Sequence, residues 1–117
     1  MKSKTSYERG VWAEFIALVY FLLRGFWPVA LRFKTKVGEI DLICRKGDLF
    51  LFVEVKARTS ISEGLFALRK RQESRLVRAA EAFLASRSLP LDSKMRFDLF
   101  VITPRFQIEH VSNIMMM

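Results

Sequence analysis

The spacing of apolar residues changes along the chain, and each change marks an expected element. Residues 7–24 are apolar at helical spacing and end at Gly25, as is typical of a helix C-terminus. Residues 29–36 alternate between apolar and polar side chains, which predicts a strand. Residues 38–56 predict two further strands joined by a turn at Lys46-Gly47.

Residues beyond this hairpin repeat the alternation of helix and strand. We expect a polar loop over residues 58–64, a second helix over residues 65–87, a strand over residues 95–103 and a short edge strand over residues 107–111. The order is α-β-β-β-α-β. Because both faces of the hairpin are apolar, we expect one α/β domain over residues 1–117, with a mixed central sheet flanked by helices.

The hairpin carries three charges on one face that is otherwise apolar. The predicted turn sets Asp41 opposite Phe52, which makes Asp41 and Glu54 diagonal neighbours across the two strands. Strand side chains alternate between faces, so Lys56 lies on the same face as Glu54. The opposite face is expected to be wholly apolar: Ile40, Leu42, Cys44, Leu49, Leu51, Val53 and Val55.

Carboxylates that share a covered site repel each other and raise each other's pKa. A divalent cation removes that conflict, and the all-oxygen donors of Asp41 and Glu54 suit both Mg²⁺ and Mn²⁺. A neighbouring lysine such as Lys56 can orient or activate water bound to such a cation. The alternative is that Glu54 and Lys56 form an ordinary surface salt bridge at a strand end.

Glu14 stands on the apolar stripe that we predict for the first helix, which runs through Tyr7, Val11, Leu18 and Phe21. A buried carboxylate is costly unless it is paired or bound to a metal ion. Glu14 therefore either pairs with a nearby arginine or joins the carboxylates of the hairpin, and the sequence favours neither interpretation.

The charge balance points to a polyanionic partner. The chain has 20 Lys and Arg against 12 Asp and Glu, a net charge of +8, which favours nucleic acid and DNA first, with an anionic membrane surface as the alternative. For each basic residue taken alone, a solvated surface charge is the simpler interpretation. The candidates for phosphate contacts are Arg32, Lys34, Lys36, Arg58, Arg69, Lys70 and Arg71.

The apolar run over residues 11–23 superficially resembles a secretory signal. Glu14 interrupts it, it is too short to span a bilayer, and no small-residue cleavage site follows. We interpret it as a buried helix and expect a cytoplasmic protein with no membrane partner. The single cysteine, Cys44, is expected to be a core residue, and the single histidine, His110, excludes a histidine-rich metal site.

Two motifs carry a resemblance to a known family. Gly38-Glu39-Ile40-Asp41-Leu42-Ile43, followed by Phe52-Val53-Glu54-Val55-Lys56, resembles the PD-(D/E)xK nuclease superfamily, which includes Holliday-junction resolvases. At finer grain the chain resembles the YraN-like family of small bacterial endonuclease-like proteins. Ala13-Glu14, Arg71-Gln72 and Arg96-Phe97-Asp98 also match. Ile40 stands where the superfamily name has proline, a position that varies even in active enzymes.

The resemblance implies a restriction-endonuclease-like fold and assigns a role to each matching residue. Asp41 and Glu54 would be metal ligands, with the Val55 carbonyl as a third and Glu14 completing the site as in the resolvase branch. Lys56 would hold or polarise the attacking water. Gln72 falls where some members place a polar residue beside the scissile phosphate.

These observations support three hypotheses from different classes. The first is a Mg²⁺- or Mn²⁺-dependent DNA endonuclease that hydrolyses phosphodiester bonds, with branched or junction DNA among its candidate substrates. The second is a non-catalytic nucleic-acid-binding module that retains a nuclease fold. The third is an interaction protein on a membrane surface, held there by the basic second helix. Resolvases of this superfamily act as dimers, so a homodimer is a further candidate.

Overall fold

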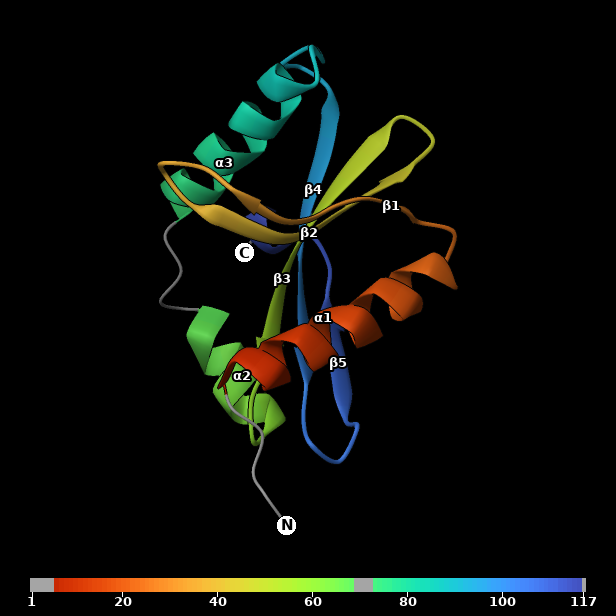
Figure 1. Cartoon of the computed structure of the whole chain (residues 1–117), viewed down its shortest axis with the longest axis vertical. Coiled ribbons are helices and arrows are strands. Elements are labelled where there is room, and N and C mark those ends of the chain that lie inside the picture. The colour runs from red at the N-terminus through yellow and green to blue at the C-terminus, as the bar shows by residue number, and fades with distance from the viewer. Residues whose placement is uncertain (1–5, 69–72, 117) are drawn as a thin grey trace.

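The structure of this chain is a computed structural model that describes residues 6–68 and 73–116. A strand hairpin, two helices and a parallel strand follow the first helix and strand, in the order expected from the sequence (Figure 1). The elements are α1 (Ser6–Leu22), β1 (Trp27–Lys34), β2 (Glu39–Lys46), β3 (Leu49–Ala57), α2 (Ile61–Leu68), α3 (Glu73–Ser86), β4 (Lys94–Ile102), β5 (Ile108–Val111) and the 3₁₀ helix η1 (Ile114–Met116).

One five-stranded sheet, in the order β1-β2-β3-β4-β5, organises the molecule. Strands β3 and β4 run parallel, and the other neighbouring pairs run antiparallel, so the sheet is mixed as expected. Helix α1 crosses one face of the sheet, and α3 covers the other (Figure 1). The α/β fold with a mixed sheet flanked by helices is therefore confirmed.

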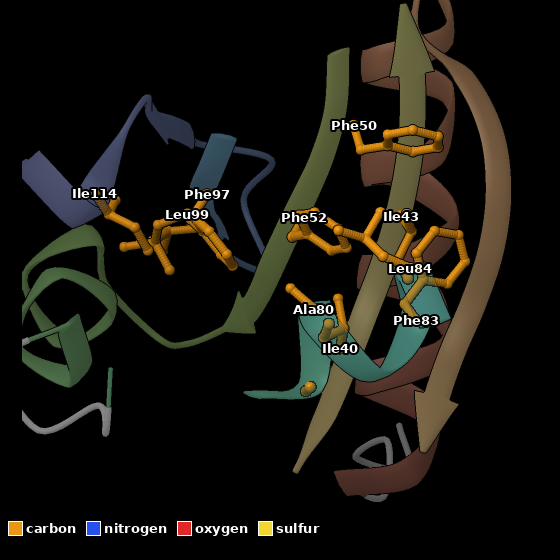
Figure 2. Close-up of a cluster of buried hydrophobic side chains, with 12 residues drawn as sticks. Ile40, Ile43, Phe50, Phe52, Ala80, Phe83, Leu84, Phe97, Leu99 and Ile114 are labelled. Atoms are coloured by element: carbon orange, nitrogen blue, oxygen red, sulfur yellow. The ribbon is translucent and has the colours of Figure 1, made fainter. Parts of the chain in front are cut away.

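Each face of the sheet has its own hydrophobic core. Figure 2 shows the core under α3, where Phe83 packs against Phe50 and Phe52 of β3. On the other face, Ala17 of α1 packs against the layer that contains Leu51 and Val53. The alternation of β3 between the two faces is thus the one predicted by its period of two.

The register of the hairpin differs from the prediction by two residues. Phe52 pairs with Ile43, and not with Asp41, because Lys46 pairs with Leu49 across a turn at Gly47 and Asp48. Gly47 has φ of +60°, a conformation that favours glycine, and this places the turn one residue later than expected. A shift of two residues in register by itself preserves the predicted alternation between the two faces.

Ile40 is the exception to this preserved alternation. It packs in the α3 core with Ile43, instead of sharing a face with Leu42. The ladder between β2 and β3 ends at Leu42 and Val53, so that Ile40 is held in the sheet by Phe33 of β1. This end of β2 thus has one neighbouring strand instead of two, and Ile40 lies towards α3.

Helix α1 is rotated relative to the predicted stripe. Its buried residues are Ala13, Ala17 and Phe21, whereas Val11 is 42% exposed. Two alanines on the buried side let the helix backbone approach the sheet closely. Trp12, Ile16, Leu18 and Tyr20 pack against this core from partly buried positions. Among the members of the predicted stripe from Val11 onward, whose side chains the structure describes, Phe21 is the one that is fully buried.

Within the predicted helix over residues 65–87 the structure describes α2 up to Leu68 and α3 from Glu73, and α2 begins inside the segment expected to be a loop. A capping arrangement starts α2: the Glu63 N–H donates to Ser60 Oγ at 3.2 Å, and the Thr59 N–H donates to Glu63 Oε2 at 3.1 Å. The spacing Ser-x-x-Glu is the sequence signal for such a helix start. Polar composition concealed it.

Candidate metal and phosphodiester site

Asp41 lies where strands β2 and β3 separate. The backbone ladder ends at Leu42 and Val53, and Asp41 Oδ2 accepts a hydrogen bond of 2.8 Å from the Val55 N–H. The carboxylate thus bonds to the backbone of β3 beyond the end of the ladder, which fixes its position relative to Glu54 and Lys56 on either side of Val55.

Glu54 and Lys56 form the ion pair that the sequence left as an alternative, but neither is a fully exposed surface residue. Lys56 Nζ lies 3.1 Å from Glu54 Oε1, and the two side chains are 25% and 18% exposed. The other carboxylate oxygen, Glu54 Oε2, is buried and has no hydrogen-bond partner. A buried anionic oxygen without a partner is costly, so this atom is a candidate ligand for a cation.

The surroundings of Glu14 bear on both interpretations that the sequence left open. Its Oε1 accepts a hydrogen bond of 2.6 Å from Arg32 Nε, so it does pair with an arginine. It also lies close enough to Asp41 to raise the pKa of that carboxyl. Arg32 has φ of +53°, an unusual backbone conformation for a residue with a side chain, and it lies in β1 beside the site.

The electrostatics of Asp41 show that the charged residues act on one another. Burial is the largest influence, and together with the charges of Glu14 and Glu54 it raises the pKa of Asp41 to about 6. The Val55 N–H and the Lys56 ammonium act in the opposite direction. The structure therefore brings Glu14, Asp41, Glu54 and Lys56 into one electrostatic neighbourhood, with more negative charge than Lys56 offsets.

Two of these carboxylates are engaged with basic partners, Glu14 with Arg32 and Glu54 with Lys56. Within residues 6–68 and 73–116, no three His, Cys, Asp or Glu side chains converge closely enough to hold a metal ion as they stand. The structure thus shows a group of interacting carboxylates, two of them held by internal ion pairs.

The remaining predicted site residues divide into two sets. Lys34, Lys36 and Arg58 are exposed, and Arg58 donates a hydrogen bond of 2.9 Å to the Ala57 carbonyl. The others, Gln72 with Arg69, Lys70 and Arg71, lie outside the residues that the structure describes. Their roles stay predictions.

A groove of about 700 Å³ opens beside Glu54 and Lys56. Helix α2 supplies one of its walls, and Arg58, which follows β3, supplies part of another. Its lining residues are Glu54, Lys56, Arg58, Ser62, Glu63, Phe66 and Ala67. The volume is in the range of a small-molecule site, so the ion pair of Glu54 and Lys56 is accessible to a ligand.

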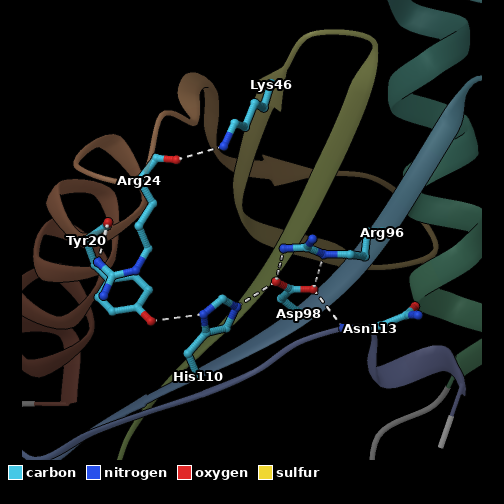
Figure 3. A network of polar contacts seen from close by, with 7 residues as sticks. All are labelled: Tyr20, Arg24, Lys46, Arg96, Asp98, His110 and Asn113. Atoms are coloured by element: carbon cyan, nitrogen blue, oxygen red, sulfur yellow. Dashed lines mark hydrogen bonds and ion pairs between the residues drawn. The ribbon is translucent and has the colours of Figure 1, made fainter.

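A second polar cluster, which sequence analysis missed, lies on the α1 face of the sheet (Figure 3). Asp98 of β4 is completely buried and accepts hydrogen bonds of 2.9 and 2.8 Å from Arg96 and of 2.9 Å from the Asn113 N–H. His110 Nε2 lies 2.6 Å from Asp98 Oδ2, and Tyr20 Oη lies 3.0 Å from His110 Nδ1. Burial acts to raise the pKa of Asp98, but the bonds from His110 and Arg96 outweigh it and hold the pKa low.

None of the described helices combines the length and the apolar character that crossing a membrane requires.

Comparison with known proteins gives a consistent result over most of the chain. The profile of a family described as "Uncharacterised protein family UPF0102" matches residues 13–102. A UPF0102 protein of Methylorubrum populi is 40% identical over 112 residues, which cover 96% of this chain and 90% of that relative. A UPF0102 protein of Bartonella tribocorum is 42% identical over 106 residues, covering 91% and 82% of the two chains.

Proposed function

We propose a function from one premise: this chain belongs to the UPF0102 (YraN-like) family, within the restriction-endonuclease-like superfamily. The names of its relatives state no activity, so the proposal depends on the site. We propose that the chain is a divalent-metal-dependent DNA endonuclease that hydrolyses phosphodiester bonds. The observation that carries this proposal is the buried Glu54 Oε2, which has no hydrogen-bond partner and lies in the same charged neighbourhood as Asp41.

The donors present fit a hard cation. Asp41 and Glu54 would hold Mg²⁺ or Mn²⁺, with the Val55 carbonyl and Glu14 as further ligands, because all four offer oxygen. The cation, when bound, would neutralise the carboxylates, polarise the phosphate and make water a stronger nucleophile.

The residues of the chain itself would position the reactants. Lys56, held at 3.1 Å by Glu54 Oε1, would orient the attacking water and stabilise the negative charge that develops on the phosphate. Water would add to phosphorus while the ester bond to the leaving oxygen breaks, and the proton that the water loses would reach that oxygen through solvent. Gln72 would lie beside the scissile phosphate.

The proposed DNA partner is supported by charge. The net charge is +8, and the exposed Lys34, Lys36 and Arg58 are available to contact phosphates. Arg32, as the partner of Glu14, would take part only if that ion pair rearranges when DNA binds. Arg69, Lys70 and Arg71 complete the proposed set. Phosphate contacts of this kind fix the position of the duplex without reading its sequence.

A homodimer would suit a substrate with two strands to cut, such as a DNA junction. The outer face of α1 supports this part of the proposal, because Val11, Phe15 and Val19 are exposed there at a spacing of four residues. We expect a Phe15→Glu substitution to convert a dimer into a monomer in light scattering. An unchanged mass would exclude this helix face as the interface.

Cleavage of labelled linear duplex, single-stranded, flap and four-way-junction DNA, with Mg²⁺, with Mn²⁺ or with EDTA, tests the proposed activity. We expect metal-dependent cutting that Glu54→Gln abolishes, because Gln neither carries the charge nor supports the Lys56 ion pair. Glu39→Gln is the matched control, since Glu39 is exposed on β2, and it should cut normally. Equal cutting by all three proteins would refute the site.

The ion pairs at Glu14 and Glu54 favour one alternative, a nucleic-acid-binding module that retains the fold without catalysis. Such a module binds DNA with steep salt dependence and without any need for a divalent cation. DNA binding that EDTA leaves unchanged, with no cutting of any substrate, would favour this alternative over the endonuclease.

A further inference from the structure

The groove beside Glu54 and Lys56 has a wall that the proposed hydrolysis does not use. Phe66 and Ala67 of α2 line it, and Phe66 is 54% exposed. We propose that this groove receives one unpaired nucleobase next to the scissile phosphate, stacked on Phe66. The substrate would then be single-stranded, or unpaired, at the cut. This role rests on the proposed function, because it places the base next to the same catalytic pair.

One side of the groove is cationic and the other is apolar, which matches the charged phosphate and the apolar base face of a nucleotide. Lys56 and Arg58 offer cations to phosphate oxygens, whereas Phe66 and Ala67 offer an apolar surface. Exposed aromatic rings beside a cationic track are the means by which proteins bind single strands, because every base has a face that can stack. In a paired duplex that face is covered by the neighbouring base pairs.

The carboxylate of Glu63 favours a base over a phosphate on the α2 side of the groove. Its carboxylate lines the groove and is bound by the hydroxyl and the N–H of Thr59, and the hydroxyl contact chiefly holds its pKa below the usual value. A lasting negative charge here repels a phosphate. It can, however, accept a hydrogen bond from the amino group of a base.

Gly64 holds the wall at its present distance from the sheet. A Cβ at this position would lie 2.2 Å from Val101 Cγ1 of β4, so a side chain there would force α2 away. The close approach of α2 to β4 and the capping of its first turn by Ser60 fix the wall on a supported helix. Phe66 thus lies on a preformed platform.

Binding of oligonucleotides to the inactive Glu54→Gln protein tests this placement. The probes are a single strand carrying 2-aminopurine at successive positions and a blunt duplex of the same sequence. We expect Phe66→Ala to weaken single-strand binding by on the order of tenfold and to remove the fluorescence quenching that stacking causes. Duplex affinity and the salt dependence of binding should not change, because no phosphate contact is lost.

Two further variants separate stacking from general effects. Phe66→Trp keeps an aromatic face and should retain single-strand binding, whereas Phe66→Leu keeps apolar volume without a ring and should resemble Phe66→Ala. Phe106→Ala is the matched control: Phe106 is also exposed, at 61%, and does not line the groove. It should bind both probes like the parent protein.

The outcomes distinguish this inference from the function on which it rests. If the parent protein binds both probes and Phe66→Ala binds the single strand equally well, the base site is refuted and the endonuclease proposal stands. If Phe66→Ala weakens duplex and single strand alike, Phe66 is no selector for unpaired bases. If the parent binds neither probe, the nucleic-acid function itself fails, and the base site fails with it.

Discussion

Two aspartates on neighbouring parts of the sheet have pKa values that are shifted in opposite directions. Asp98 is completely buried, yet Arg96, His110 and the Asn113 N–H surround it and hold its pKa low. Asp41 keeps part of its surface exposed, and its pKa is raised to about 6 although the Val55 N–H donates a hydrogen bond to it. Burial of a carboxylate therefore does not by itself mark a functional site. What separates the two is whether the surroundings compensate the charge.

The comparison assigns different tasks to the two regions. The Asp98 cluster joins α1, β4, β5 and the segment before η1, so its charge is used to hold the chain together. At the candidate site, burial and the neighbouring charges of Glu14 and Glu54 oppose the negative charge of Asp41. Charge that destabilises the folded state and is nonetheless present is typical of binding and catalytic sites.

Removal of Asp98 should cause the largest loss of stability. Asp98→Ala leaves Arg96 and His110 without their carboxylate in a buried setting, and we expect the free energy of unfolding to fall by about 3 kcal/mol. Urea denaturation at pH 7 measures it. Asp92→Ala, at an exposed position before β4, is the control and should change stability by less than about 0.5 kcal/mol. A loss of similar size in both variants would contradict the contrast.

Neutralising Asp41 should have the opposite sign. In metal-free buffer at pH 7.5 we expect Asp41→Asn to raise the free energy of unfolding by about 2 kcal/mol, because it removes a charge that burial and two carboxylates oppose. The amide oxygen can still accept the Val55 N–H. Glu39→Gln, on the exposed part of β2, should leave stability unchanged. Destabilisation by Asp41→Asn would show that this carboxylate is structural.

The two aspartates should also respond oppositely to pH. The pKa of Asp41 rises from 3.8 to about 6 on folding. The stability that this shift contributes is therefore fully present below pH 3.8 and is lost as the pH rises through about 6. The pKa of Asp98 falls below 3.8, so its contribution is full above that value and is lost as the pH drops through the folded pKa. Between pH 4 and 7, the pH dependence of urea unfolding should therefore differ between the parent protein and Asp41→Asn. Glu39→Gln should show the same pH dependence as the parent protein.

The outer member of the Asp98 cluster should matter least. Tyr20→Phe removes the hydroxyl that lies 3.0 Å from His110 Nδ1 and keeps the ring contacts with Phe21 and Phe100. We expect a loss of about 1 kcal/mol in thermal or urea unfolding. A loss as large as that of Asp98→Ala would mean that the cluster depends on its outer hydrogen bond.

The alternation of apolar and polar residues predicts which face of a strand each side chain lies on. The faces of Glu54 and Lys56 follow from the period of two along β3. Asp41 lies beyond the end of the ladder and is held beside them by its hydrogen bond from the Val55 N–H, which the alternation alone does not predict. The pairing of Glu14 with an arginine was one of two open interpretations, and only the structure shows that Arg32 is the partner.

Contacts between distant parts of the chain leave no such signal. Tyr20 and His110 are 90 residues apart, so the Asp98 cluster could not be inferred from spacing, and His110 could not be assigned a role. The ladder between β2 and β3 ends at Leu42 and Val53, before Ile40 and Asp41, and the alternation of polar and apolar residues does not encode this end point. The start of α2 was predictable in principle from Ser60 and Glu63.

The measurement that tests the central claim most directly is the unfolding free energy with and without Mn²⁺ at pH 7.5. A ligand that binds only the folded state stabilises it, by roughly 2.7 kcal/mol at a concentration 100 times its Kd. We predict that Mn²⁺ stabilises the parent protein and Asp98→Asn but not Asp41→Asn. Equal stabilisation of all three proteins, or none of the parent, would contradict the claim that Asp41 keeps its charge for a cation.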